Sequence, residues 1–486
     1  MIVFFVIVVS IFFILFLKFY KKTVCSLPGP KTYPILGNAL EFLREEPLKV
    51  LHRWERVYGN IYRVYLGKDL YVIMTNPEDI EVILSSYKHT LKAVSYKFIS
   101  SWLGNGLITS YGDIWYKHRK FLTPTFHFKI LESSIEIIHK NVEVLVKQLQ
   151  VKDGKCDFNM LEYIEKNSLD IICEVAMDVK INAQTSNDAG YLEAVKNVTN
   201  ISTERIFKIW FQVDILFRLF GKYKLFHKSL EIMEKISKNV IASKRRRIEE
   251  NIITDCDNIN NESKKKLPVP FLDSILKESN FTDDEIHSEV MSFLFAGHDT
   301  TTSAICFCLY QLANYPDVQN KVYEEITELI PNDRMPSIQE LNSLKYTDNV
   351  IKETLRLYPP VPMIGRTLLE EVKLPSGHTL PANTNLNIFI FGLHHNPNIF
   401  TRPEEFIPER FDNENKRHPF SYISFSAGPR NCIGQRLAML EIKIVIVALL
   451  KNYKLLPANE TKSLTLIMEL ILRTKEGIPM RLMKRD

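Results

Sequence analysis

Hydrophobic positions recur with the period of an α-helix through most of residues 115–360. Before this region, residues 61–75 are rich in β-branched and aromatic side chains around a Gly67-Lys68-Asp69 turn, which predicts a β-hairpin. Residues 372–393 and the tail from about Leu464 are also strand-like. The pattern therefore predicts a mainly α fold with small β-sheets (α+β) near the two ends of the domain.

The first 22 residues are predicted to form a transmembrane anchor. No charge occurs in residues 1–17, and Lys18, Lys21 and Lys22 follow. A spanning helix needs about 20 apolar residues, and Lys18 can extend this slightly short segment by reaching the membrane interface. A cleaved signal peptide is disfavoured, because positive charge should precede its apolar core. The positive-inside rule then puts the rest of the chain in the cytosol.

A hinge and one large domain are expected after the anchor. Residues 23–38 contain the sequence LPGP, which is too stiff for a helix. Residues 39–486 then form the single domain, in which residues 258–270 are predicted to be a polar loop. Residues 205–226 interleave basic and large apolar side chains. They fit a core-facing helix with a basic edge and a surface element that dips into the membrane equally well.

Composition excludes several classes of protein. The 486-residue chain has a net charge of only +5, so nothing demands a nucleic-acid partner. Its seven cysteines are odd in number and include no CxxC pair, which argues against a disulfide framework and a Cys-rich zinc site. The sequence also lacks the G-x-G-x-x-G and P-loop patterns. The chain therefore has no obvious site for NADPH or a flavin.

In the stretch FSAGPRNCIG, residues 425–434, one cysteine is surrounded by two glycines, a proline and an arginine. Cys432 lies just before an apolar helix, whose dipole is expected to lower the pKa of the thiol. Gly434 leaves room for something flat beside the backbone. Arg430 offers a bidentate donor for a carboxylate. A thiolate, a flat neighbour and a carboxylate partner together indicate haem bound through cysteine.

The same stretch resembles the haem-binding signature of the cytochrome P450 superfamily. The matching positions are Phe425, Gly428, Arg430, Cys432 and Gly434. Taken alone, the motif leaves open a chance glycine-rich loop around a free cysteine. The resemblance covers essentially the whole chain, and EVMSFLFAGHDTT at residues 289–301 is most similar to family 4, the fatty-acid ω-hydroxylase group. It implies the P450 fold and haem b with Cys432 as axial ligand.

A second motif, KETLRLYPPVP at residues 352–362, carries Glu353 and Arg356 on one helix face. FIPERF supplies Arg410. In the resembled superfamily these three residues form a structural network that holds the loop before the cysteine. Breaking it is expected to leave a buried charge unpaired, which costs roughly 3–5 kcal/mol.

A third motif places polar residues inside the apolar helix FLFAGHDTTTSA, residues 293–304. One interpretation is a helix bend, in which threonine hydroxyls bond back to the previous turn. The resemblance implies instead that Gly297 opens a groove for dioxygen. It also makes Asp299 and Thr300 the acid–alcohol pair that relays protons, and so the catalytic residues.

The resemblance also implies contacts to the cofactor and the substrate. Trp115 and Arg119 in WYKHR, together with Arg366, are expected to reach the haem propionates. Many family 4 members carry at position 296 a glutamate that can esterify the haem, whereas this chain has Ala296. We therefore expect a non-covalent haem. The predicted substrate pocket is apolar and includes Ala296, Pro362, Met363 and Ile364.

The function that follows is a membrane-anchored haem-thiolate monooxygenase. It would hydroxylate a fatty acid or related lipid, a hydrocarbon, a terpenoid or a foreign compound at the cytosolic face of the endoplasmic reticulum. NADPH–cytochrome P450 reductase would supply electrons, with cytochrome b5 as a second donor. Lys117, Lys120 and Arg436 fit either an acidic docking partner or an ordinary solvated surface. A haem-thiolate isomerase or dehydratase and a non-catalytic haem-binding protein are the alternatives, and the acid–alcohol pair argues against both.

Overall fold

The structure is a computed structural model that describes residue 10 and residues 26–126, 128–154, 157–186, 190–257, 271–277, 280–331, 334–412, 417–459 and 463–485. The predicted anchor, apart from Ser10, and the predicted loop at residues 258–270 lie outside these ranges. Within them, no helix is both long enough and apolar enough to cross a bilayer.

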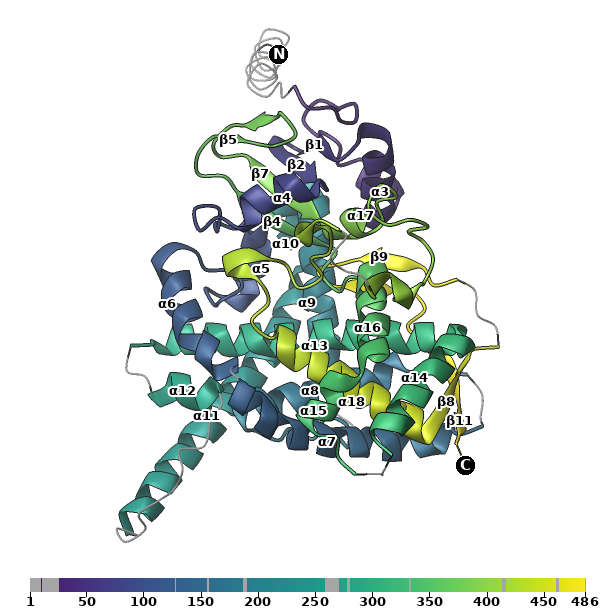
Figure 1. The fold of residues 1–486 in the computed structure, drawn as a ribbon. Helices are drawn as coiled ribbons and strands as arrows, with labels where there is room; N and C mark the ends of the chain where they lie inside the picture. The colour runs from purple at the N-terminus through teal and green to yellow at the C-terminus, as the bar shows by residue number, and fades with distance from the viewer. Residues whose placement is uncertain are drawn as a thin grey trace.

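Helices dominate the described fold, as the sequence pattern predicts (Figure 1). The α-helices are α2 Glu41–Arg44, α3 Pro47–Tyr58, α4 Pro77–Leu84, α5 Lys97–Leu103, α6 Gly112–Leu122, α7 Phe128–Leu149, α8 Leu161–Met177, α9 Gly190–Phe207, α10 Asp214–Phe220, α11 Tyr223–Asp257, α12 Phe271–Lys277, α13 Asp283–Asn314, α14 Pro316–Leu329, α15 Ile338–Ser343, α16 Lys345–Leu357, α17 Ile390–His394 and α18 Gln435–Asn452. Short 3-10 turns include η4 Ile209–Gln212, η5 Pro408–Phe411 and η8 Gly428–Arg430.

Four small sheets complete the described fold. Their strands are β1 Ile61–Leu66, β2 Asp69–Met74, β3 Phe158–Asn159, β4 Met363–Thr367, β5 Val372–Lys373, β6 Thr379–Leu380, β7 Asn385–Phe389, β8 Tyr453–Pro457, β9 Leu466–Met468, β10 Leu472–Thr474 and β11 Pro479–Lys484. The strand order is β1-β2-β7-β4 in the largest sheet, β3-β11-β8 in the next, and β9 and β5 pair with β10 and β6. The mainly α, α+β prediction is therefore confirmed.

The predicted hairpin is confirmed, since β1 and β2 pair antiparallel from Ile61 opposite Met74 to Leu66 opposite Asp69. Gly67 allows the tight connection because its φ of 62° is in the left-handed region. The strand prediction at residues 372–393 is wrong over its last residues, which form α17. There the Phe391 N–H bonds to the Pro362 carbonyl instead of a ladder partner.

Helix α13 runs through the middle of the molecule (Figure 1), packed against α8 and α18. Thr282 and Glu285 form a capping box at its start. Most of its residues are buried on every side, which explains why its sequence is apolar all round. A Cβ atom at Gly297 would lie 2.4 Å from the Ile172 side chain of α8. Close packing of these two helices therefore requires glycine at this position.

Residues 205–226 form no single helix. They comprise the end of α9, η4, α10 and the start of α11. Phe217 is buried, but Ile215 is 64% exposed, Leu219 67% and Phe220 74%. Phe207 and Phe226 are also buried in the hydrophobic core. The core-facing interpretation therefore holds for part of the segment, while its other apolar side chains lie on the surface. Ile209 of η4 lies beside the β1–β2 turn at Gly67.

Candidate active site

The Cys432 loop is a compact turn between two fixed points. The Cys432 N–H donates to the Phe425 carbonyl at 2.9 Å, and η8 fills the turn between them. Cys432 is exposed, whereas Cys173, Cys306 and Cys308 are buried. All four are free thiols. The loop thus presents an accessible thiol in a compact backbone frame.

The two glycines of the loop, Gly428 and Gly434, lie in different surroundings and have different roles. Gly428 has a φ of 69°, and a Cβ there would lie 1.8 Å from the Leu84 carbonyl oxygen at the end of α4. It is needed for conformation and for close packing. Gly434 has an ordinary φ of −88°, and a Cβ there would meet nothing within 4 Å. Neither reason applies to Gly434, so the open space beside Cys432 is what a flat cofactor would use.

The predicted lowering of the thiol pKa is wrong for the protein chain. Although Cys432 is accessible, protein surrounds it closely enough that desolvation raises the pKa of its thiol. The Gly434 N–H and the charge of Arg119 act in the opposite direction. Helix α18 begins only at Gln435, three residues after Cys432. A coordinating metal ion deprotonates a thiol outright, so ligation itself is expected to stabilise the thiolate.

Helix α6 brings Trp115 and Arg119 to this loop. Trp115 is buried, and the Arg430 guanidinium lies 4.7 Å from the centre of its ring. Arg119 donates to the Asn431 carbonyl at 2.9 Å and to the Asn431 side-chain oxygen at 2.6 Å. Arg430 also donates to the carbonyls of Ile108 and Ser110. The residues predicted to bind propionates therefore surround the cysteine loop.

Four cations near the loop form no ion pair with any carboxylate of the described chain: Lys92, Arg119, Arg366 and Arg430. Arg366, on β4, is buried and donates only to the neighbouring Gly365 carbonyl. Burial and the charge of Arg366 lower the pKa of Arg430 to about 9. Unpaired buried cations are costly, so this cluster fits an anionic group such as the two propionates of haem.

Lys92 is the member of this cluster that no sequence motif reveals. Its Nζ lies 4.7 Å from the centre of the Tyr96 ring. Burial lowers the pKa of Lys92 well below its usual value, and the charges of Arg366 and Arg430 act in the same direction. The Lys92 carbonyl accepts from the Thr367 hydroxyl at the end of β4. A tertiary contact thus brings a loop lysine to Arg366.

The polar stretch of α13 has two sides. Ala296, Gly297 and Thr300 keep some accessibility, whereas His298 and Asp299 are buried. The Thr300 hydroxyl donates to the Ala296 carbonyl at 2.7 Å, as the helix-bend interpretation requires. Asp299 instead faces β10, where Arg473 Nη2 lies 2.7 and 2.8 Å from its two oxygens. The predicted acid–alcohol pair therefore includes an acid with a fixed partner that the sequence pattern did not indicate.

The structure brings together the three residues of the predicted network, Glu353, Arg356 and Arg410. Arg356 donates to both oxygens of Glu353, at 2.7 and 2.9 Å, and Arg410 Nε lies 3.0 Å from one of them. Glu353 and Arg356 are fully buried. Arg356 also donates to three backbone carbonyls, those of His394, Pro403 and Glu405.

His394 links this network to the cysteine loop, a role that sequence reasoning missed. Its Nε2 accepts from the Ile423 N–H at 3.0 Å, and the Ser424 hydroxyl donates to the Leu355 carbonyl of α16. Burial, with the nearby charge of Arg356, lowers the pKa of His394 to about 3. The neutral ring can therefore act as an acceptor.

The predicted substrate-pocket residues lie on two segments. Ala296 lies on α13, and residues 362–364 lead from α16 into β4. Pro362 and Ile364 are buried and Met363 is half-buried. The Pro360 carbonyl accepts from the Leu472 N–H of β10, which fixes this connection.

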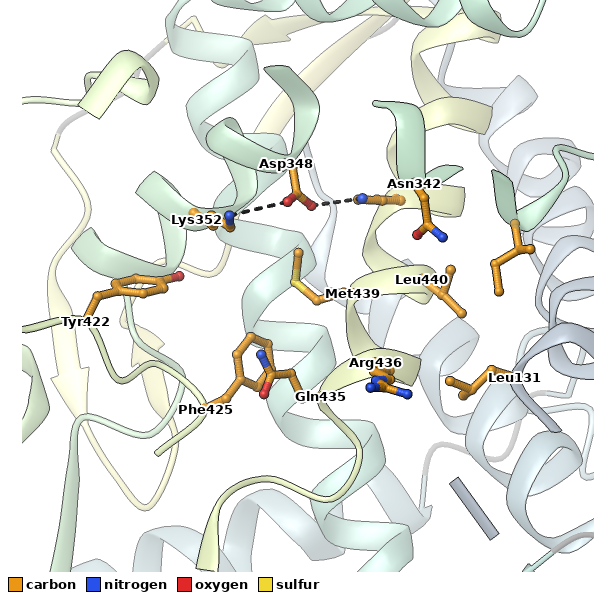
Figure 2. Close-up of a pocket in the computed structure, with 12 residues that line it drawn as sticks. Leu131, Asn342, Asp348, Lys352, Tyr422, Phe425, Gln435, Arg436, Met439 and Leu440 are labelled. Carbon is orange, nitrogen blue, oxygen red and sulfur yellow. Dashed lines mark ion pairs between the residues drawn. The ribbon is translucent and has the colours of Figure 1, made fainter. Parts of the chain in front are cut away.

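A pocket of about 630 Å³ lies beside the cysteine loop (Figure 2). Phe425 and Gln435, which precede and follow Cys432, both line it. Its wall includes Asp348, which pairs with Lys443 at 2.8 Å and Lys352 at 3.5 Å. Arg436 also lines it and is exposed.

Comparisons with known proteins agree with this arrangement. A family model described as Cytochrome P450 matches residues 27–480. Cytochrome P450 4d2 of Drosophila melanogaster is 42% identical over 473 residues, covering 94% of this chain and 94% of that protein. Cytochrome P450 4c3 of the same organism is 37% identical over 485 residues, covering 96% and 90%. Cytochrome P450 4c21 of Blattella germanica is 36% identical over 461 residues, covering 93% and 92%.

Matches of this length and identity establish the family. The relatives named above are family 4 members, as the α13 motif predicts. The accessible thiol, the unpaired cations and the open space at Gly434 also fit the cofactor of that family. The chain therefore belongs to the cytochrome P450 family and is a haem-thiolate monooxygenase, with haem b held through a cysteine thiolate.

Proposed function

We propose that this monooxygenase hydroxylates lipophilic substrates, with fatty acids as the first class to test. The residues at the expected pocket, Ala296 and residues 362–364, are all apolar. Hydrocarbons, terpenoids and foreign compounds fit the same chemistry. Glutamate is absent at position 296, so we infer a haem held by Cys432 and non-covalent contacts alone.

One observation carries the cofactor assignment: the accessible Cys432 thiol lies among cations that lack carboxylate partners. In this proposal Cys432 is the axial ligand. Trp115, Arg119, Arg366 and Arg430, joined by Lys92, hold the propionates, and Phe425, Gly428 and Gly434 shape the loop. When bound, the haem supplies oxygen activation, which the electron-donating thiolate favours. The protein orients the substrate and excludes water.

Asp299 and Thr300 are proposed to deliver protons. Thr300 retains accessibility on α13, and its hydroxyl is held on the Ala296 carbonyl. Asp299 lies one residue away, held by Arg473. This intact pair disfavours an isomerase, a dehydratase and a non-catalytic haem protein, because none of them needs protons delivered to bound oxygen.

We propose that residues 1–22 anchor the enzyme, that residues 23–38 form the hinge, and that residues 39–486 form the catalytic domain. Exposed apolar side chains support a membrane-facing surface next to the hinge. Ile35, in the hinge, lies with Ile209 beside Gly67. The exposed apolar residues of the nearby segment are Val213, Ile215, Leu219 and Phe220. The proposed location is the cytosolic face of the endoplasmic reticulum membrane.

NADPH–cytochrome P450 reductase is the proposed electron donor, with cytochrome b5 as the second. Lys120 and Arg436 are exposed cations on the two helices that flank the cysteine loop, α6 and α18. Lys117 is less available, since it pairs with Glu285 at 3.6 Å. An acidic partner would be attracted to this surface.

Titration of the purified ferric protein with medium- and long-chain fatty acids tests the substrate class. A low-to-high-spin change in the haem absorption means that the ligand displaces water from iron, and it would rank the chain lengths. If only terpenoids or foreign compounds produce this change, the fatty-acid proposal fails and the monooxygenase remains. A protein that takes up no haem after supplementation would contradict the role of Cys432.

A further inference from the structure

A buried histidine–glutamate pair, His118 and Glu289, joins α6 to α13. His118 Nδ1 lies 2.6 Å from Glu289 Oε1, and both side chains have no exposed surface. His118 Nε2 lies 3.4 Å from Glu285 Oε1, so both ring nitrogens face carboxylates. One imidazole ring of α6 therefore contacts two carboxylates of α13.

The position of His118 on α6 gives the pair its significance. It follows Trp115 by three residues and immediately precedes Arg119, whose side chain reaches Asn431 beside Cys432. Helix α6 is therefore attached at one turn to the cysteine loop and to α13. The ring of His118 also packs on Phe281, with centroids 4.9 Å apart.

The position of Glu289 on α13 completes the connection. Ala296 follows it by seven residues, which is two helical turns, so the two lie on one face of α13. Burial raises the pKa of Glu289, while His118 and the Leu107 N–H lower it. Its carboxyl group has no exposed surface, and its contact with His118 is the shorter of the two that the ring makes with carboxylates.

We propose that the His118–Glu289 hydrogen bond is a positioning contact that sets α6 against α13 for retention of the haem. The inference rests on the proposed role of α6 in holding the propionates. His118 and Glu289 need not touch the cofactor. They fix the helix whose side chains do.

Two uncharged variants of similar length isolate the hydrogen bond. Glu289→Gln keeps an oxygen that accepts from His118, whereas Glu289→Met does not. We expect Glu289→Gln to release haem to excess apomyoglobin at nearly the wild-type rate. Glu289→Met should release it roughly 10–100-fold faster, the usual effect of losing a supporting contact around a bound metal. The reduced carbon monoxide complex of Glu289→Met should also lose thiolate ligation sooner, as read from its Soret band.

The matched control is the solvent-facing pair His139–Glu143 on α7, at 3.4 Å. Glu143→Gln and Glu143→Met should both release haem at the wild-type rate. Equal rates for the two Glu289 variants would overturn the proposal. If Glu289→Met does not fold, the double variant His118→Leu/Glu289→Leu replaces the pair with an apolar contact, which is often neutral for stability. A folded double variant with wild-type haem release would also overturn it. Wild-type protein without a thiolate-type Soret band would instead mean that the proposed function fails.

Discussion

Arg473 holds Asp299 through one nitrogen that lies 2.7 Å from one carboxylate oxygen and 2.8 Å from the other. The Nε of the same guanidinium lies 3.1 Å from Glu469, and Asp299 is only 1% exposed. The acid proposed to deliver protons is thus held in place by a partner from β10, a strand far along the chain.

Replacing Asp299 with asparagine tests its role in proton delivery. The change keeps the shape and one acceptor oxygen but removes the ionisable group. We expect turnover to fall by roughly 100-fold, within the usual contribution of a positioned acid or base, and hydrogen peroxide per NADPH to rise. Both are measured in one oxygen-consumption assay. Asp348→Asn, which alters an ion pair away from α13, should leave the coupling unchanged; wild-type coupling in Asp299→Asn would contradict the proposal.

Glu353→Gln is expected to destabilise the folded protein by roughly 3–5 kcal/mol, because two buried arginines lose their counter-charge. Glu136→Gln removes the partner of Lys140 at the surface of α7, where an ion pair contributes little to stability. Denaturant unfolding of both holoproteins measures the difference. Equal losses would mean that the buried network contributes no more than a surface pair.

Replacing the two loop glycines with alanine should have different effects, one on folding and the other on haem content. Gly428→Ala places a methyl group against the Leu84 carbonyl at positive φ, so the loop cannot close and the folded yield should drop. Gly434→Ala meets no protein atom, so thermal unfolding of the haem-free chain should be unchanged. Its haem content should nevertheless fall. Full haem content in folded Gly434→Ala would argue against a cofactor beside this residue.

The buried carboxyl of Glu441 predicts how stability depends on pH. Desolvation raises its pKa to about 8, although the Ser168 hydroxyl lowers it. Between the unfolded value near 4.5 and about 8, the folded state holds a proton that the unfolded state has lost. Stability from this group is therefore complete below the lower value and falls as pH rises through that window, by about 1.4 kcal/mol per pH unit.

Glu441→Gln should remove this dependence. The variant is expected to gain stability at pH 8 relative to wild type and to gain little at pH 5. Thermal unfolding at four pH values across the window measures the change. A parallel dependence in the two proteins would mean that Glu441 is ionised in the folded state.

The absence of glutamate at position 296 predicts how the haem is held. Acidified organic solvent should extract all of the haem from the wild-type protein, because Ala296 cannot form an ester. The Ala296→Glu variant offers a carboxylate at the same place and should retain part of the haem after turnover. Wild-type protein that keeps its haem through extraction would show a covalent attachment.

Local sequence signals predicted the parts of the fold that depend on local physics. The Gly67 turn and its flanking strands are an example, since turn chemistry and strand pattern act within fifteen residues. The cysteine loop could also be predicted from the sequence, because glycine, proline and arginine are unusual at that spacing around a cysteine. The sequence did not decide whether residues 205–226 face the core or the surface, because periodicity alone does not reveal which apolar face is left uncovered.

The missed residues share one physical cause: their partners are distant in sequence. Lys92 joins Arg366 through a loop that pairs with β4. Arg473 meets Asp299 across 174 positions. His118 stood inside the WYKHR motif, but nothing in the sequence pointed to Glu289 as its acceptor. Electrostatic contacts between residues this far apart produce no periodic pattern in the sequence.

Arg356 holds the segment at residues 403–405 by donating hydrogen bonds to the carbonyl oxygens of Pro403 and Glu405. Every amino acid offers the same carbonyl, so substitutions at 403 and 405 leave these bonds intact provided the backbone path is kept. A change at Arg356 removes all of them at once. The tolerance of this segment to substitution therefore depends on a single side chain of α16, so residues 403 and 405 can vary while Arg356 keeps the backbone in place.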